Sequence, residues 1–128
     1  MFNVELMGYR KIPSKKNSMS FNTKTKRMYK SADVKEFEAY LAQLANEAKT
    51  EWEAHNKIAW PMGKQYYLKI ECVWGDKRVR DLQNVFASVC DALNGILYDD
   101  DSQITRIAAL KQYEKDTWTF NLTLEVEQ

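Results

Sequence analysis

The sequence predicts a single α/β domain over residues 1–128, with a mixed sheet of about four strands and two helices in the order β-α-β-α-β-β. Three segments alternate apolar and polar residues, which is the period of a half-buried strand, and a fourth is interpreted as a strand from its length and composition. Two further segments repeat apolar residues every three or four positions, as helices do. With 128 residues, of which 45% are hydrophobic, the chain can bury one core without disulfides or metals.

The first predicted strand covers residues 2–9, where Phe2, Val4 and Leu6 share one face. Residues 10–31 show no sustained periodicity and are interpreted as a long loop. This loop holds eight Lys or Arg residues and no acidic residue. Composition leaves two interpretations open, a solvated charged loop or a segment that binds a polyanion.

Aromatic residues within and beside this loop favour the second interpretation. Tyr9, Phe21 and Tyr29 lie among the lysines, and aromatic rings can stack on unpaired bases while lysines neutralise phosphates. The sequence therefore predicts that the loop binds a nucleic acid, and the basic residues that precede Asp81 are candidates for the same contact. The predicted nucleic-acid-binding residues are Arg10, Lys15, Lys16, Asn17, Lys24, Lys26, Arg27, Lys30, Lys77, Arg78 and Arg80.

The first helix is expected to begin at a cap on Ser31 or Asp33 and to end near residue 54. Its apolar stripe is wide, which favours a helix that faces the core over one that binds a partner. The stripe consists of Val34, Phe37, Leu41, Leu44, Ala48 and Trp52. A strand is predicted next, over residues 66–74, where alternation returns.

The second helix is expected to begin after Asp81, a favourable N-cap, and to end at Gly95. Its apolar positions have helical spacing, while Gln83, Ala87 and Asp91 fall four residues apart on one flank. Residues 103–113 and 117–127 are then interpreted as two strands of a hairpin, joined by the short polar segment 114–116.

Acidic residues flank this second helix on both sides. Taken singly, Asp81 is an ordinary N-cap and Asp99-Asp100-Asp101 an ordinary solvated turn. Three adjacent carboxylates repel one another, however, so the cluster favours a site for a hard cation such as Mg²⁺. The helix between the two acidic points is about 20 Å long. We therefore expect convergence only if strand 103–113 returns beside strand 66–74.

Three motifs in this region resemble the RusA family of Holliday junction resolvases. They are Arg80-Asp81-Leu82-Gln83-Asn84, Asp91-Ala92-Leu93 and Asp100-Asp101-Ser102-Gln103-Ile104. The basic segment Pro13-Ser14-Lys15-Lys16-Asn17 also resembles the family. The resemblance implies a cytoplasmic, homodimeric, Mg²⁺-dependent endonuclease, often phage or prophage encoded, that cuts four-way DNA junctions during recombination and repair.

The resemblance also implies a site. Asp81, Asp100 and Asp101 are the expected metal ligands, for Mg²⁺ or for Mn²⁺ in its place, with Asp91 and Lys111 as further catalytic candidates. Two positions depart from the family pattern, because Gln83 stands where an aspartate is expected and Ala87 where a lysine is expected. An alternative interpretation is therefore a branched-DNA-binding protein whose cutting is impaired, and a third is a protein-interaction domain.

Other functional classes find little support in the composition. His55 is the only histidine, which argues against zinc, and Cys72 and Cys90 fit small buried thiols. The N-terminal residues lack a signal-peptide pattern and no apolar run is long enough to span a membrane. We expect a cytoplasmic protein with no membrane partner and no small-molecule cofactor.

Overall fold

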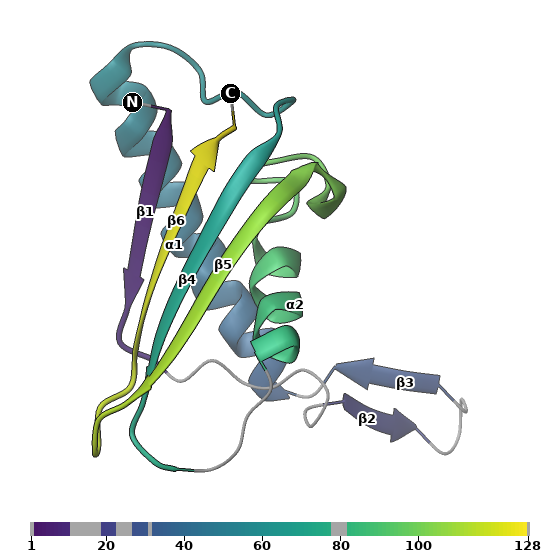
Figure 1. The fold of residues 1–128 in the computed structure, drawn as a ribbon. Helices are drawn as coiled ribbons and strands as arrows, with labels where there is room; N and C mark the ends of the chain where they lie inside the picture. The colour runs from purple at the N-terminus through teal and green to yellow at the C-terminus, as the bar shows by residue number, and fades with distance from the viewer. Residues whose placement is uncertain (1, 11–18, 23–26, 31, 78–81, 128) are drawn as a thin grey trace.

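The computed structural model describes residues 2–10, 19–22, 27–30, 32–77 and 82–127. They form an α/β domain in which two helices lie on one side of a four-stranded mixed sheet (Figure 1). The class and the order of the main elements are as predicted. The elements are β1 (Asn3–Gly8), β2 (Met19–Asn22), β3 (Arg27–Lys30), α1 (Ala32–Asn56), β4 (Tyr66–Trp74), α2 (Leu82–Leu93), β5 (Ile104–Tyr113) and β6 (Thr119–Val126).

The strand order in the sheet is β1-β6-β4-β5. Strand β5 pairs with β4 in parallel, and β6 pairs with β4 and β1 in antiparallel fashion. The expected hairpin of β5 and β6 is therefore wrong, because β4 lies between them. The connection passes across the end of β4, where the N–H of Glu114 donates to the carbonyl oxygen of Trp74 at 3.0 Å and that of Asp116 to Gly75 at 3.1 Å.

The physical reason for the crossing is that β4 is the most buried strand of the sheet. Every second side chain of β4, from Tyr66 to Trp74, is buried. A central strand needs hydrogen-bonding partners on both of its edges. A short polar turn is compatible with a hairpin, but it equally allows the chain to step over one strand.

The segment interpreted as a long loop contains secondary structure. Strands β2 and β3 pair in antiparallel register, with Ser20 opposite Tyr29 and Phe21 opposite Met28. Figure 1 shows this hairpin extending away from the main sheet. Strands of four residues with mixed side chains carry too few positions for a period-2 pattern, so they are not apparent from the sequence.

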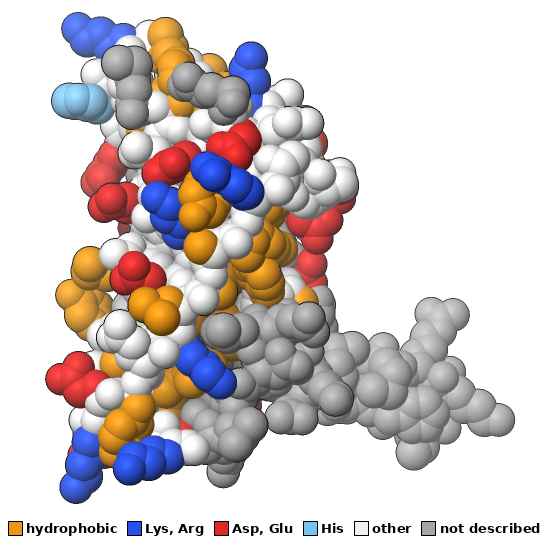
Figure 2. Space-filling view, in the orientation of Figure 1, with side chains coloured by type: hydrophobic (Ala, Val, Ile, Leu, Met, Phe, Trp, Pro, Cys, Tyr) orange, Lys and Arg blue, Asp and Glu red, His pale blue; other side chains and the backbone are white. Residues whose placement is uncertain are grey.

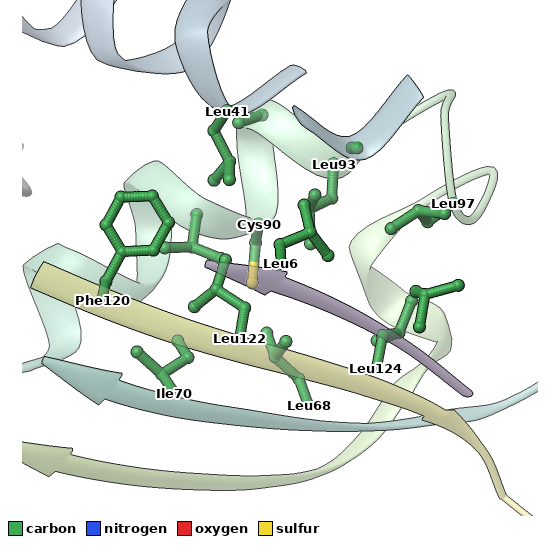
Figure 3. Packing of buried hydrophobic residues seen from close by; sticks show 14 of the residues in the cluster. Leu6, Leu41, Leu68, Ile70, Cys90, Leu93, Leu97, Phe120, Leu122 and Leu124 are labelled. Carbon is green, nitrogen blue, oxygen red and sulfur yellow. The ribbon is translucent and has the colours of Figure 1, made fainter. Parts of the chain in front are cut away.

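The core lies between the sheet and the two helices (Figure 3). Phe37, Leu41 and Ala45 of α1 are buried there, as are Val85 and Val89 of α2. The stripe on the first helix is thus a core face, as expected. Leu122 of β6 is fully buried, so its truncation to Ala would cost about 2–5 kcal/mol of stability.

The other face of the sheet is open and carries both signs of charge (Figure 2). Lys69 pairs with Glu125 at 3.2 Å, and Arg106 pairs with Glu127 at 2.8 Å. Such pairing leaves little net field to attract a polyanion. Within the described ranges, none of the helices combines the length and apolar character that crossing a membrane requires.

Candidate active site

The acidic turn, residues 99–103, follows directly on a buried anchor. Tyr98 is fully buried, and its hydroxyl donates a hydrogen bond to the carbonyl oxygen of Cys90 at 2.8 Å. Gly95 ends the helix region with a φ of 78°, a left-handed conformation that glycine adopts without strain. The chain leaves the core at Tyr98, and the carboxylates of Asp99, Asp100 and Asp101 are exposed.

Gln103 ties the acidic turn together. Its side-chain oxygen accepts hydrogen bonds from the backbone N–H groups of Asp99 and Asp100, both at 2.9 Å. Its amide nitrogen donates to the carbonyl oxygens of Met62 and Lys64, both at 2.8 Å. The side chain thus holds the acidic turn against the segment that leads into β4.

Asp100 caps the short 3₁₀ helix Asp101–Gln103, and together with Gln103 it forms a capping box. Its carboxylate accepts a hydrogen bond from the N–H of Ser102 at 3.0 Å. Hydrogen bonds from Ser102 lower the pKa of the Asp100 carboxyl, because they favour its charged form. The spacing Asp-x-x-Gln, a capping-box signature, could have revealed the role of Gln103 from the sequence.

Asp101 differs from Asp100 in what its carboxylate contacts. Within the described part of the chain, the Asp101 side chain makes no hydrogen bond or ion pair, and it is exposed. A carboxylate presented in this way by an ordered turn can offer its oxygens to a cation or to a water molecule. Asp101 is therefore the more available candidate ligand of the two.

Asp91 lies near the end of α2 that meets the acidic turn. Burial raises the pKa of the Tyr98 phenol, and the negative charges of Asp101 and Asp91 add to this effect. Two candidate residues from different elements thus act on the same buried phenol. Among the described residues, however, no three His, Cys, Asp or Glu side chains are grouped as metal ligands would be.

Lys111 lies at the other end of the sheet. It is opposite Cys72 in the parallel register of β4 and β5, so its side chain is on the helix face. The Lys111 ammonium is 6.0 Å from the centre of the Trp74 ring. Lys77, which follows β4, has its ammonium 5.2 Å from the ring centre of Tyr113.

The two ends of the site are separated by the length of β4. The acidic turn precedes Ile104, which pairs with the first residue of β4, whereas Lys77 follows the last. Nine residues of strand correspond to about 26 Å. Asp81 lies outside the described residues, but its neighbour Leu82 begins α2, and α2 is about 18 Å long.

This arrangement corrects one expectation. Strand β5 does lie beside β4 at the edge of the sheet, which was the expected condition for convergence. Because the two strands are parallel, the acidic turn nevertheless stays at the end of the sheet opposite to the start of α2. A single copy of the chain does not fold the acidic turn back to the helix start.

The predicted DNA-binding residues have different outcomes. Arg10 forms an ion pair with Glu36 at 2.7 Å and lies over the ring of Tyr40. Arg27 and Lys30 belong to β3, and Lys77 is exposed at the end of β4. Outside the described residues lie Lys15, Lys16, Asn17, Lys24, Lys26, Arg78 and Arg80.

The chain is similar to a known protein family. A family model described as endodeoxyribonuclease RusA matches residues 11–124 of the 128. The match covers the predicted basic segment, the second helix, the acidic turn and most of β6. No curated protein matches the chain.

Proposed function

Since the chain belongs to the RusA family of endodeoxyribonucleases, we propose that it resolves four-way DNA junctions in the cytoplasm by metal-dependent hydrolysis of phosphodiester bonds. The observation that carries this proposal is the acidic turn, an ordered and exposed group of carboxylates braced by Gln103. A catalytic site requires charged side chains that neighbouring groups hold in a fixed geometry.

The proposed metal ligands are Asp81, Asp100 and Asp101. Carboxylate oxygens are the ligands that Mg²⁺ and Mn²⁺ prefer, so the chemistry of this donor set fits the metal. When bound, a divalent cation would neutralise the scissile phosphate and lower the pKa of a coordinated water. Asp101 offers a carboxylate that makes no hydrogen bond or ion pair among the described residues, Asp100 shapes the turn around it, and Lys111 contributes a positive charge for the phosphate.

A second copy of the chain could bring an acidic turn close to the start of an α2 helix, which a single copy keeps at opposite ends of the sheet. Strand β5 is an edge strand of ten residues, and its exposed side chains include Ile107 and Leu110, which are 44% and 48% accessible. A long edge with apolar side chains on both faces favours pairing with another strand. We propose that β5 pairs with β5 of a second copy to form a homodimer.

Antiparallel pairing of two β5 strands has a direct consequence for the site. A twofold axis near the middle of β5 sets the start of one strand beside the end of its partner. The acidic turn of each copy would then lie beside the Lys111 end of the other, near the start of the other copy's α2. Each site would combine Asp100 and Asp101 of one copy with Asp81 of the other.

Twofold symmetry also suits the substrate, because a four-way junction is resolved by cutting two strands symmetrically. The proposed footprint combines the basic residues of segment 10–30 with the cluster at Lys77, Arg78 and Arg80. The open face of the sheet is a poor alternative, since its charges are paired and mixed in sign (Figure 2).

A second candidate function is supported by two positions in the sequence. Gln83 keeps an oxygen ligand but lacks the negative charge of an aspartate, and Ala87 lacks a cation. Both changes weaken a metal and phosphate site. A protein that grips branched DNA without cutting it is therefore the alternative that the experiment must separate.

The test is incubation of the protein with a synthetic four-way junction, with and without Mg²⁺ or Mn²⁺, beside a linear duplex of the same sequence. We expect junction-selective binding in chelator and symmetric cuts only with metal. Binding without cutting at any metal concentration would support the alternative. Equal affinity for junction and duplex would contradict both. Sedimentation showing only a 15 kDa species, with and without DNA, would contradict the dimer.

A further inference from the structure

Tyr113 is the last residue of β5 and presents a large aromatic ring at the surface. Its side chain is on the helix face, as that of Lys111 is, because residues two apart in a strand share one face. In the register with β4, Tyr113 is opposite Trp74 and Lys111 is opposite Cys72. Tyr113 is 48% accessible. The exposed position of so large a ring has no explanation in the packing of the core.

The backbone around Tyr113 is held firmly. The next residue, Glu114, donates its N–H to Trp74, and the N–H of Thr117 closes the turn on Glu114 at 3.0 Å. The end of β4 is equally tight, since a Cβ on Gly75 would lie 2.8 Å from Nε1 of Trp118 and 2.9 Å from the backbone nitrogen of Thr117. A ring on such a support loses little conformational freedom when it binds a ligand.

One lysine contacts this ring and two more are close to it in sequence. Lys77 lies over the ring of Tyr113, Lys111 is two residues away on the same face, and Lys115 is exposed on the following turn. The turn also carries the carboxylates of Glu114 and Asp116. In Figure 2 basic side chains gather at this end of the molecule, over the β5–β6 connection.

An aromatic ring with flanking ammonium groups matches the chemistry of an unstacked nucleotide. The base can stack on the ring while the phosphates contact the lysines, and this mode tolerates any base. A regular duplex offers no free base face, whereas a branch point interrupts stacking. Such an arrangement would favour branched over linear DNA.

We propose that Tyr113 stacks on a base at the branch point of the junction, with Lys77 and Lys111 on the neighbouring phosphates. The proposal rests on the proposed function for its substrate. It assigns to Tyr113 a role in recognising the junction, separate from the carboxylates that act on the phosphate. Because Tyr113 is the last residue of β5, it lies at the margin of the proposed dimer interface.

The test uses the full chain in chelator, so that binding is measured without cutting. Affinities for a four-way junction and a linear duplex are compared for Tyr113→Phe, Tyr113→Leu and Tyr113→Ala. The matched control is Tyr67→Ala, a tyrosine that also lies beside a cation, with the Arg106 guanidinium 4.0 Å from its ring centre, but on the open face. Folding of each variant is checked by circular dichroism.

We expect Tyr113→Phe and Tyr67→Ala to bind the junction as the wild type does. Tyr113→Leu and Tyr113→Ala should bind it roughly 5- to 100-fold more weakly, which is the range for loss of one stacked base. Their duplex affinity should not change. A junction with 5-iododeoxyuridine at the branch point should crosslink to Tyr113 on irradiation.

Wild-type affinity in the Leu and Ala variants, or crosslinks that map elsewhere, would overturn the proposal and leave Tyr113 as a surface partner of Lys77. Failure of the proposed function gives a different result. If the wild type crosslinks through Tyr113 but does not cut with any metal, the stacking site stands and only nuclease activity is lost.

Discussion

The backbone N–H of Asp100 donates a hydrogen bond to the side-chain oxygen of Gln103 at 2.9 Å, while the carboxylate of Asp100 caps the same short turn. This pair sets the shape of the acidic turn. Through its amide nitrogen, Gln103 also ties that turn to the carbonyl groups of Met62 and Lys64, before β4. The geometry of the candidate ligands therefore depends on one neutral side chain.

Gln103→Ala should loosen the acidic turn and raise the Mg²⁺ concentration needed for cutting. It should also lower the free energy of unfolding by about 1 kcal/mol, because it removes hydrogen bonds whose partners are mostly exposed to water. Urea unfolding and a magnesium titration of junction cleavage measure both effects. Gln43→Ala, an exposed glutamine on α1 and away from the acidic turn and β5, is the control. Unchanged metal dependence in Gln103→Ala would contradict the bracing role.

Asp81→Asn and Asp101→Asn should each lower the cutting rate by at least roughly 100-fold, because the amide keeps the shape of a ligand without its charge. Binding in chelator should stay intact or tighten, since repulsion from phosphates is relieved. Asp100→Asn should be milder, because its amide oxygen can still accept the N–H of Ser102. Cutting by Asp81→Asn at the wild-type rate would exclude Asp81 from the site.

A mixture of Asp81→Asn and Asp101→Asn proteins should recover the cutting that each lacks alone. In a mixed dimer with shared sites, one site loses both carboxylates and the other keeps both. The product should be a junction nicked on one strand, measured on a denaturing gel. The control mixture, Asp101→Asn with the Asp81→Asn, Asp101→Asn double variant, should stay inert. No recovery in proven mixed dimers would contradict sharing.

Gln83→Asp should raise the cutting rate or lower the Mg²⁺ concentration required. The substitution adds a negative charge where the family pattern expects one, which strengthens attraction to a divalent cation. The measurement is the magnesium titration of cleavage against wild type. A wild type that is inert at every Mg²⁺ concentration, and that Gln83→Asp does not rescue, would favour the binding-protein alternative.

Alkaline pH should destabilise the fold. Burial raises the pKa of the Cys72 thiol to about 12, and burial also raises the pKa values of Tyr66 and Tyr98. The unfolded chain loses its thiol proton near pH 8.5 while the folded chain retains it. Stability is therefore complete below about pH 8.5 and falls as pH rises towards 12.

The slope for one such group is about 1.4 kcal/mol per pH unit. Urea unfolding between pH 7 and 11 measures the decline, and Cys72→Val should make it shallower. An unfolding midpoint that is constant across this range would show that the buried thiol and phenols do not control stability at alkaline pH.

Much of the fold follows from local patterns. Alternation from Tyr66 to Trp74 predicts β4 with its observed bounds, and helical spacing with Gly95 predicts where α2 ends. These signals are visible because a residue's burial depends on the face of its own helix or strand. The acidic motif is also a local signal, because adjacent residues in the sequence identify the candidate carboxylates without any information on tertiary contacts.

The partner of each strand was decided only by the tertiary structure. Strands β5 and β6 adjoin in sequence but flank β4 in space, because the buried central strand requires a hydrogen-bonding partner on each side. Parallel pairing of β5 with β4 in turn keeps the acidic turn and the start of α2 at opposite ends of the sheet. The sequence alone identifies the candidate carboxylates of this protein. Long-range strand pairing decides that a single copy keeps its acidic turn far from the start of α2.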